Sequence, residues 1–338
     1  MAKKDREKKR QRDSSDGPEM HRRGLFTTAA KLAGLEAVRE ITQGTDTVVG
    51  IANRGAHRVL DAIIEHEEPV PADLQRNTTL TRTGRNKVYG YGHSIMAGVR
   101  ADDVPIVARV GTDLRQEGLR VDTISEAVPG STVNELGSQL DNAIKHGRIP
   151  PKEEGEKRDV QLWTGGNEVP PSTVAALNSL RQNPLQPGKW RQLREETQQL
   201  NQNYRDQFTT HGTRIVRETE ADSLTAYGFP DLTRAQRIGQ TDVKTGESST
   251  LIVDDNSLSA KAVKAAAKMA MNSLNRTMYQ ATRKVRDVTG IEATGINPNS
   301  VITPSSFENP EGIHDQHINA RTAGDVARLR VRRYNIEE

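Results

Sequence analysis

Three short segments that read as strands, each followed by a turn containing glycine, recur at nearly even intervals through the first half of the chain. They cover 88–91, 120–127 and 159–163, and amphipathic stretches at 102–118 and 133–144 separate them. Strands that alternate with helices in this way form parallel βαβ units. The sequence therefore predicts an α/β fold. In such a fold the turns after the strands lie together at one edge of a parallel sheet, where ligands bind.

The first of these turns contains a candidate nucleophile. Residues 88–100 read Val-Tyr-Gly-Tyr-Gly-His-Ser-Ile-Met-Ala-Gly-Val-Arg, so that Gly92 and Gly98 flank a sharp bend containing Ser94. The spacing differs from the Gly-x-Ser-x-Gly elbow of α/β-hydrolases, because Met96 stands where the second glycine would be. Glycine on both sides of Ser94 lets the backbone approach a substrate closely.

Composition excludes several classes of protein. The 338 residues are 33% hydrophobic and 28% charged, which is enough for one modest core with polar extensions. There is no cysteine, so disulfides, thiolate metal sites and a cysteine nucleophile are all excluded. The net charge is +3, but residues 1–23 hold nine basic and five acidic residues, so the rest of the chain gives no strong nucleic-acid signal. No apolar run is long enough to cross a membrane.

The N-terminal region indicates a tail followed by helices. Residues 1–23 are expected to form a disordered basic tail. Within it, Arg22 and Arg23 resemble a twin-arginine export signal, but Lys31 and Glu36 interrupt the apolar stretch that follows. We therefore expect a cytoplasmic protein, with export through a degenerate signal as the less favoured alternative. Residues 24–83 are expected to be helical and to end in a polar linker.

The remaining sequence predicts a core that is interrupted by helices. The predicted core covers 84–182 and 291–338, and 183–290 is expected to be a mainly helical insertion with long helices at 190–208 and 259–287. Short strands are expected at 213–217 and 301–303, and a loop at 290–299. Asn319 is expected to cap a final helix that ends near Tyr334.

Four separated blocks of this sequence resemble those of the SGNH (GDSL-type) esterase and lipase superfamily. The first contains Ser94 with Gly98 four residues later, and the second is 127–132 around Gly130. The third, after an apolar strand, is Gly-Gly-Asn-Glu with Asn167, and the last is a histidine-containing segment just before the terminal helix. The resemblance covers about 84–178 and 298–335. The chain departs from the family pattern at two positions, because His93 and Glu168 stand where the family has aspartate.

The resemblance implies both a fold and an activity. The fold would be a three-layer α/β/α arrangement around a short parallel sheet, as in flavodoxin-like proteins. The activity would be a serine esterase or lipase that needs no cofactor and hydrolyses a small-molecule, lipid or carbohydrate ester. By resemblance, Ser94 would be the nucleophile, and the oxyanion hole would consist of the backbone N–H groups of Ser94 and Gly130 and the side chain of Asn167.

The resemblance leaves two candidates for the general base. Glu311 and His314 keep the three-residue spacing of the family's acid and base, with Glu in place of Asp. His317 instead keeps the position relative to the cap residue of the final helix, and its nearest carboxylate is Asp315. We favour His317 with Asp315. His314, Asp315 and His317 together suggest a metal site only weakly, because no further ligand cluster is present, and no metal is expected.

Two classes of function are compatible with these features. One is a serine hydrolase acting on an ester. The other is a non-catalytic interaction or structural protein that retains an SGNH core and binds a protein partner through helical arms at 24–68 and 183–290. His93 in place of aspartate favours the second class, whereas retention of the serine, glycine, asparagine and histidine of the site favours the first.

Overall fold

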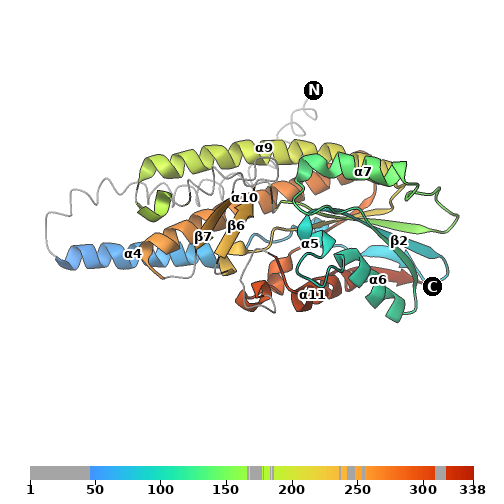
Figure 1. Ribbon diagram of the computed structural model, residues 1–338, viewed down its shortest axis with the longest axis horizontal. Coiled ribbons are helices and arrows are strands. Elements are labelled where there is room, and N and C mark those ends of the chain that lie inside the picture. Colours follow the sequence, from blue (N-terminus) through green and yellow to red (C-terminus); the bar gives the residue numbers. More distant parts are fainter. Residues whose placement is uncertain are drawn as a thin grey trace, which may run out of the picture.

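The computed structural model describes residues 46–165, 167, 177, 179–182, 184, 186–235, 237–241, 248–252, 256–308 and 317–338. The molecule is elongated, with a sheet near one end and helices that extend beyond it (Figure 1). The predicted basic tail, the twin-arginine pair and residues 24–45 of the expected helical segment lie outside the described residues, so those predictions and the cellular compartment remain predictions. None of the helices in the described part of the chain is long and apolar enough to span a membrane.

A five-stranded parallel sheet forms the core, as the sequence predicts. The strands lie in the order β3 (Arg120–Ser125), β2 (Arg85–Gly92), β4 (Lys157–Trp163), β5 (Ser223–Tyr227) and β8 (Glu292–Ile296). β2 is the first of these five strands in sequence, and it is flanked by the second and third, β3 and β4. This is the strand order of flavodoxin-like folds. β2 is buried along nearly its whole length, which is typical of a parallel strand covered on both faces.

Helices cover both faces of the sheet and complete three layers (Figure 1). On one face, α6 (Ile106–Gln116) and α11 (Ala320–Val331) pack against Val88, Trp163 and Tyr227. On the other face, α7 (Leu136–Lys145), α9 (Pro187–Glu218) and α10 (Leu258–Thr289) pack against Tyr89 and Leu162. Side chains alternate between the two faces along each strand, so β2 contributes Val88 to one layer and Tyr89 to the other. The predicted α/β/α class is confirmed.

The expected insertion at 183–290 needs correction, because one of the five core strands lies inside it. β5 pairs with β4 on one side and β8 on the other. Its sequence, Ser-Leu-Thr-Ala-Tyr, includes two polar residues and is not an apolar run. Ser223 and Thr225 are nevertheless buried, and they donate hydrogen bonds to the buried carboxylate of Asp159 (2.7 and 3.2 Å). Those contacts join residues more than 60 positions apart, so the local pattern does not reveal the strand.

Two short strands and one loop that the sequence predicts were also wrong. Residues 213–217 belong to the end of α9, where Ile215 and Val216 are buried on one helical face. Short apolar runs of this kind do not distinguish helix from strand. The expected loop at 290–299 contains β8, and 301–303 form no strand.

The two ends of the core are joined by a small second sheet. β1 (Thr78–Thr81) lies in the expected linker and pairs in parallel with β9 (Tyr334–Glu337). The final helix therefore ends at Val331, slightly earlier than predicted. Buried Arg330 supports this junction, since its guanidinium donates to Thr78 Oγ1 (2.5 Å) and lies 3.0 Å from an Asp159 carboxylate oxygen. A separate antiparallel pair consists of β6 (Arg237–Thr241) and β7 (Ser248–Ile252).

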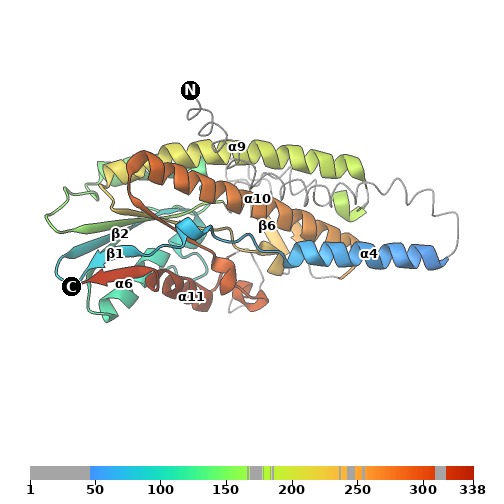
Figure 2. The same ribbon diagram turned by 180° about the vertical axis from the view of Figure 1, so that it is seen from behind.

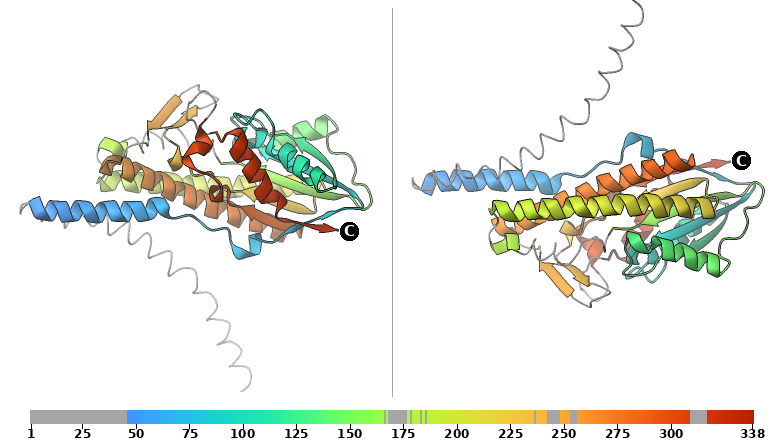
Figure 3. Two further views of the ribbon diagram at one scale, coloured as in Figure 1. Left: turned by 90° about the horizontal axis from the view of Figure 1, so that it is seen from below. Right: turned by 90° about the horizontal axis from the view of Figure 1, so that it is seen from above.

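The helix α4 (Asp46–Glu65) and the segment that follows it lie along α10 (Figures 2 and 3). Leu60 packs against Ala262 and Ala265, which are small enough to let the helices approach closely. Acidic residues of this segment pair in order with basic residues of α10. The pairs include Asp61–Lys261 (2.7 Å), Glu68–Arg276 (2.7 Å) and Asp73–Arg283 (2.5 Å). The ion pair with Arg283 holds the pKa of the Asp73 carboxyl below its usual value.

Candidate active site

Ser94 lies at a sharp turn between β2 and the single helical turn α5 (Ser94–Ala97). Gly92 has φ 138°, and a Cβ atom at this position would lie 2.0 Å from the carbonyl oxygen of Trp163. Gly98 ends the helical turn in the left-handed region at φ 84°. Both positions therefore require glycine. The turn holds Ser94 at the carboxyl end of a central strand, where ligands bind in open α/β sheets.

The imidazole of His317 lies next to Ser94, with Nε2 2.9 Å from Ser94 Oγ. Asn319 fixes the position of this histidine, because its side chain accepts from Thr322 N (3.0 Å) and caps α11. The Asn319 side chain also donates to the carbonyl groups of Ser305 (2.8 Å) and Glu308 (3.1 Å). A serine within hydrogen-bond reach of a histidine base is the minimal arrangement for nucleophilic catalysis.

Both candidates for the supporting carboxylate, Glu311 and Asp315, lie outside the described residues, as does His314. The choice of Asp315 over Glu311 therefore remains a prediction, as does the role of the unused histidine. Across the described residues, no group of three or more histidine, aspartate and glutamate side chains is arranged to hold a metal ion.

The turn after β3 and the turn after β4 meet beside the Ser94 bend. Gly130 has φ 81° in the first of these turns, which again favours glycine. Asn167, in the second, donates from Nδ2 to the carbonyl oxygen of Ser131 (3.0 Å). The N–H of Val128 donates to the carbonyl of Gly92 (3.0 Å) and joins the first turn to the bend. The three turns singled out from the sequence are thus in contact, while Glu168 lies outside the described residues.

His93 serves as the N-cap of α5, the position at which the family has aspartate. Its Nδ1 accepts a hydrogen bond from Ile95 N (3.1 Å), as the oxygen of an aspartate cap would. The acceptor role of Nδ1 places the proton of the neutral ring on Nε2. The side chain is 1% exposed. Burial, with a smaller effect from nearby His317, lowers its pKa from 6.5 to about 3. His93 is therefore uncharged near neutral pH.

The lowered pKa of His93 predicts a pH-dependent stability. Below about pH 6.5 the unfolded chain binds a proton at this residue and the folded chain does not, so stability falls as the pH falls from 6.5 toward 3. The slope is about 1.4 kcal/mol per pH unit. His93→Asn keeps a cap acceptor but removes the titrating group, and should flatten the curve of unfolding free energy in that range. Urea unfolding at pH 7 and pH 5 measures the difference.

The control for this experiment is the same comparison between pH 9 and pH 8, where His93 is uncharged in both the folded and the unfolded chain. Over that interval His93→Asn and the unmodified protein should change in stability by equal amounts. If His93→Asn and the unmodified protein lose equal stability between pH 7 and pH 5, His93 does not stay neutral in the folded chain.

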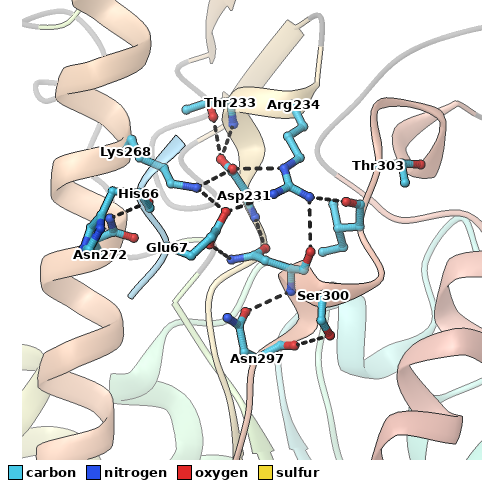
Figure 4. Close-up of polar contacts among 12 residues, drawn as sticks. His66, Glu67, Asp231, Thr233, Arg234, Lys268, Asn272, Asn297, Ser300 and Thr303 are labelled. Carbon is cyan, nitrogen blue, oxygen red and sulfur yellow. Dashed lines mark hydrogen bonds and ion pairs between the residues drawn. The ribbon is translucent and has the colours of Figure 1, made fainter. Parts of the chain in front are cut away.

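A partly buried ionic cluster supports the loop that follows β8 (Figure 4). Lys268 of α10, 1% exposed, lies 2.6 Å from Asp231 and also binds Glu67. Arg234 pairs with Asp231 (3.2 Å) and donates to the carbonyl oxygens of Asn299 (3.1 Å) and Ile302. The cluster thus ties the end of the α4 segment and α10 to the loop after β8. The sequence could not reveal it, because Lys268 and Glu67 are 201 positions apart.

Sequence reasoning also missed two buried polar side chains that connect the three turns, Ser131 and Gln139. Gln139 lies on the apolar face of α7, three residues after Leu136 and four before Ala143, and next to Leu140. A polar residue on an apolar helical face was the available signal, because such a group requires buried hydrogen-bond partners.

Comparison with known proteins gives similarity at the level of solved structures. No family model and no curated protein matches the chain. A lipase/acylhydrolase from Enterococcus faecalis is 14% identical, with 73% of this chain and 94% of that chain covered, at a TM-score of 0.39. An extracellular lipase from Streptomyces rimosus is 13% identical, with 73% and 97% covered, at 0.44. Phospholipase A1 from Streptomyces albidoflavus is 12% identical, with 72% and 97% covered, at 0.42.

Proposed function

We propose that this chain is a serine hydrolase of the SGNH type that cleaves an acetyl, acyl or lipid ester. The observation that supports this proposal most strongly is the 2.9 Å contact between Ser94 Oγ and His317 Nε2. The two residues are 223 positions apart in sequence. Their contact lies at the edge of the sheet where the sequence motifs and the strand order independently predict a ligand site.

In the proposed mechanism, His317 accepts the Ser94 hydroxyl proton as the oxygen attacks the ester carbonyl carbon. The resulting oxyanion accepts hydrogen bonds from the backbone N–H groups of Ser94 and Gly130 and from Asn167 Nδ2. When the intermediate collapses, the alcohol leaves with the proton from His317. A water molecule then attacks the acyl carbon and gives a proton to His317, which passes it to Ser94 Oγ as the carboxylic acid leaves.

Hydrolysis of a graded set of p-nitrophenyl esters by the full chain tests the proposal. Acetate, butyrate and octanoate esters cover short and longer acyl groups, and release of p-nitrophenol measures turnover. We expect turnover above the buffer rate for at least one ester, and the preferred chain length separates acetyl esters from lipid-like esters. Absence of turnover with every ester would favour the alternative of an interaction protein that retains the fold.

The proposed role of Asn167 predicts a specific kinetic effect. Asn167→Ala should lower kcat by about 10²- to 10³-fold with a much smaller change in KM, because an oxyanion donor acts mainly in the transition state. Steady-state kinetics with the best ester measures both constants. Asn201→Ala is the matched control, since it removes a carboxamide that donates to Ser273 between α9 and α10 (2.7 Å). An unchanged kcat in Asn167→Ala would exclude Asn167 from the oxyanion hole.

A further inference from the structure

The side chain of Gln139 makes a paired hydrogen-bond contact with the backbone of Gly92, two residues before Ser94. Gln139 Oε1 accepts from Gly92 N (2.8 Å), and Gln139 Nε2 donates to Gly92 O (2.8 Å). A backbone N–H can only donate, so this contact also determines which end of the carboxamide is oxygen. Gln139 is 4% exposed, so water does not compete for these bonds.

Ser131 extends the connection to the other two turns. Its Oγ accepts from Gln139 Nε2 (2.9 Å) and lies 2.8 Å from the carbonyl oxygens of both Gly92 and Val128. The single hydroxyl proton of Ser131 can be donated to either carbonyl, so Ser131 binds the Gly92 bend and its own turn. The Ser131 carbonyl accepts from Asn167 Nδ2 (3.0 Å). A continuous chain of contacts thus joins Gly92, Gln139, Ser131 and Asn167.

Each of the three proposed oxyanion donors is adjacent to this chain of contacts. Ser94 follows Gly92 by two residues, Gly130 precedes Ser131 directly, and Asn167 is itself a member. Oxyanion stabilisation depends on donors that are held in place before the reaction, and small displacements weaken it. A buried polar network in which the groups satisfy one another is rigid enough to hold them.

We propose that Gln139 is a positioning residue that sets the relative placement of the three oxyanion donors, acting through Gly92 and Ser131. This inference rests on the proposed function, and it assigns to α7 a part in catalysis that the motifs do not indicate. Gln139 touches no reacting atom. Its effect should therefore be seen in kcat and not in substrate affinity.

Two variants separate positioning from simple packing. Gln139→Met keeps a similar volume but cannot make the paired contact. Gln139→Glu keeps both shape and volume. Its neutral acid has one accepting and one donating oxygen, so it reproduces the paired contact with Gly92 and loses only the donation to Ser131 Oγ, whereas its carboxylate has only acceptors and faces the Gly92 carbonyl unfavourably. Burial raises the pKa of such a carboxyl group, so its neutral form persists to higher pH than that of an exposed glutamate.

Other titratable groups around α7 are the same in all three proteins. Each has a partner or a packing contact in the structure: Glu126 with Arg148 (2.7 Å), Glu135 with Thr132, Asp141 with Arg214 (2.5 Å), and His211 against Gly137. Tyr91, on β2, has its pKa raised by burial out of the assay range. Comparing each variant with the unmodified protein at the same pH removes the contributions of these groups.

The experiment measures kcat, KM and the melting temperature of the unmodified chain, Gln139→Glu and Gln139→Met across pH. Gln139→Met should lose about 10²-fold in kcat at every pH, with KM nearly unchanged. The ratio of Gln139→Glu kcat to unmodified kcat should be highest at the acidic end and fall as the pH rises. This alkaline loss should be absent from the unmodified protein and should occur without a matching fall in melting temperature.

Labelling by a fluorophosphonate probe, run in parallel, distinguishes the possible failures. If the unmodified chain labels and both variants keep its kcat and pH profile, the positioning role is wrong and the proposed function stands. If the unmodified chain neither labels nor hydrolyses any ester, the proposed function is wrong and this inference is overturned with it. Should Gln139→Met fail to fold, the pH-dependent ratio for Gln139→Glu still decides the matter, because it compares two protonation states of one folded protein.

Discussion

Ser94→Ala should lower kcat/KM for ester hydrolysis by about 10³-fold or more while leaving the melting temperature nearly unchanged. Removal of the nucleophile ends covalent catalysis, and the residual rate comes from the oxyanion donors and substrate binding. The fold should tolerate the change, because the replaced hydroxyl contacts His317 and alanine fits in the same space. Steady-state kinetics and thermal unfolding test the two parts of this expectation.

The control for this prediction is Ser300→Ala, which removes an exposed hydroxyl that donates to Asn297 O (3.0 Å). It should retain full activity. Ser94→Ala with more than a tenth of the unmodified kcat/KM would show that another group performs the hydrolysis.

His317→Ala should lower kcat/KM about as much as Ser94→Ala, and the double variant should be no worse than either single variant. The serine and its base act as one unit, so their individual losses do not add. Loss of the base should also remove the acidic limb that a histidine base gives to the pH profile of kcat/KM. Kinetics of the two single variants and the double variant across pH test all three statements.

His314→Ala serves as the comparison for the choice of base and should retain most of the activity. His317→Ala with full activity, together with an inactive His314→Ala, would assign the base to His314 and its supporting carboxylate to Glu311. Replacing Asp315 and Glu311 separately then identifies the acid, because loss of the correct carboxylate should lower kcat by orders of magnitude and loss of the other should not.

Those parts of the fold with local sequence signals could be predicted. β2, β3 and β4 are short strand-like segments that end in glycine turns and alternate with amphipathic helices, and the N-cap residue Asn319 marks the start of α11. β5 could not be predicted, because Ser223 and Thr225 are polar for a reason that lies on another strand, the carboxylate of Asp159. β1 could not be predicted either, since its partner β9 is about 250 residues away and only the folded chain brings the two together.

The candidate site also contains parts that the sequence predicts and parts that it does not. The contact between Ser94 and His317 follows from two local features, a glycine-flanked bend and a helix cap, which place their side chains at the same edge of the sheet. The supporting shell depends on long-range contacts. Gln139 is 47 positions from Gly92, and Lys268 is 37 from Asp231, so no periodicity or motif connects either pair.

The central claim is that Ser94 is an activated nucleophile, and covalent labelling tests it most directly. The full chain is incubated with a fluorophosphonate probe, digested, and searched for the modified peptide by mass spectrometry. One probe per chain on Ser94, with no labelling of Ser94→Ala and greatly slowed labelling of His317→Ala, is the predicted result. An unlabelled chain, or labelling on a different serine that persists in Ser94→Ala, would contradict it.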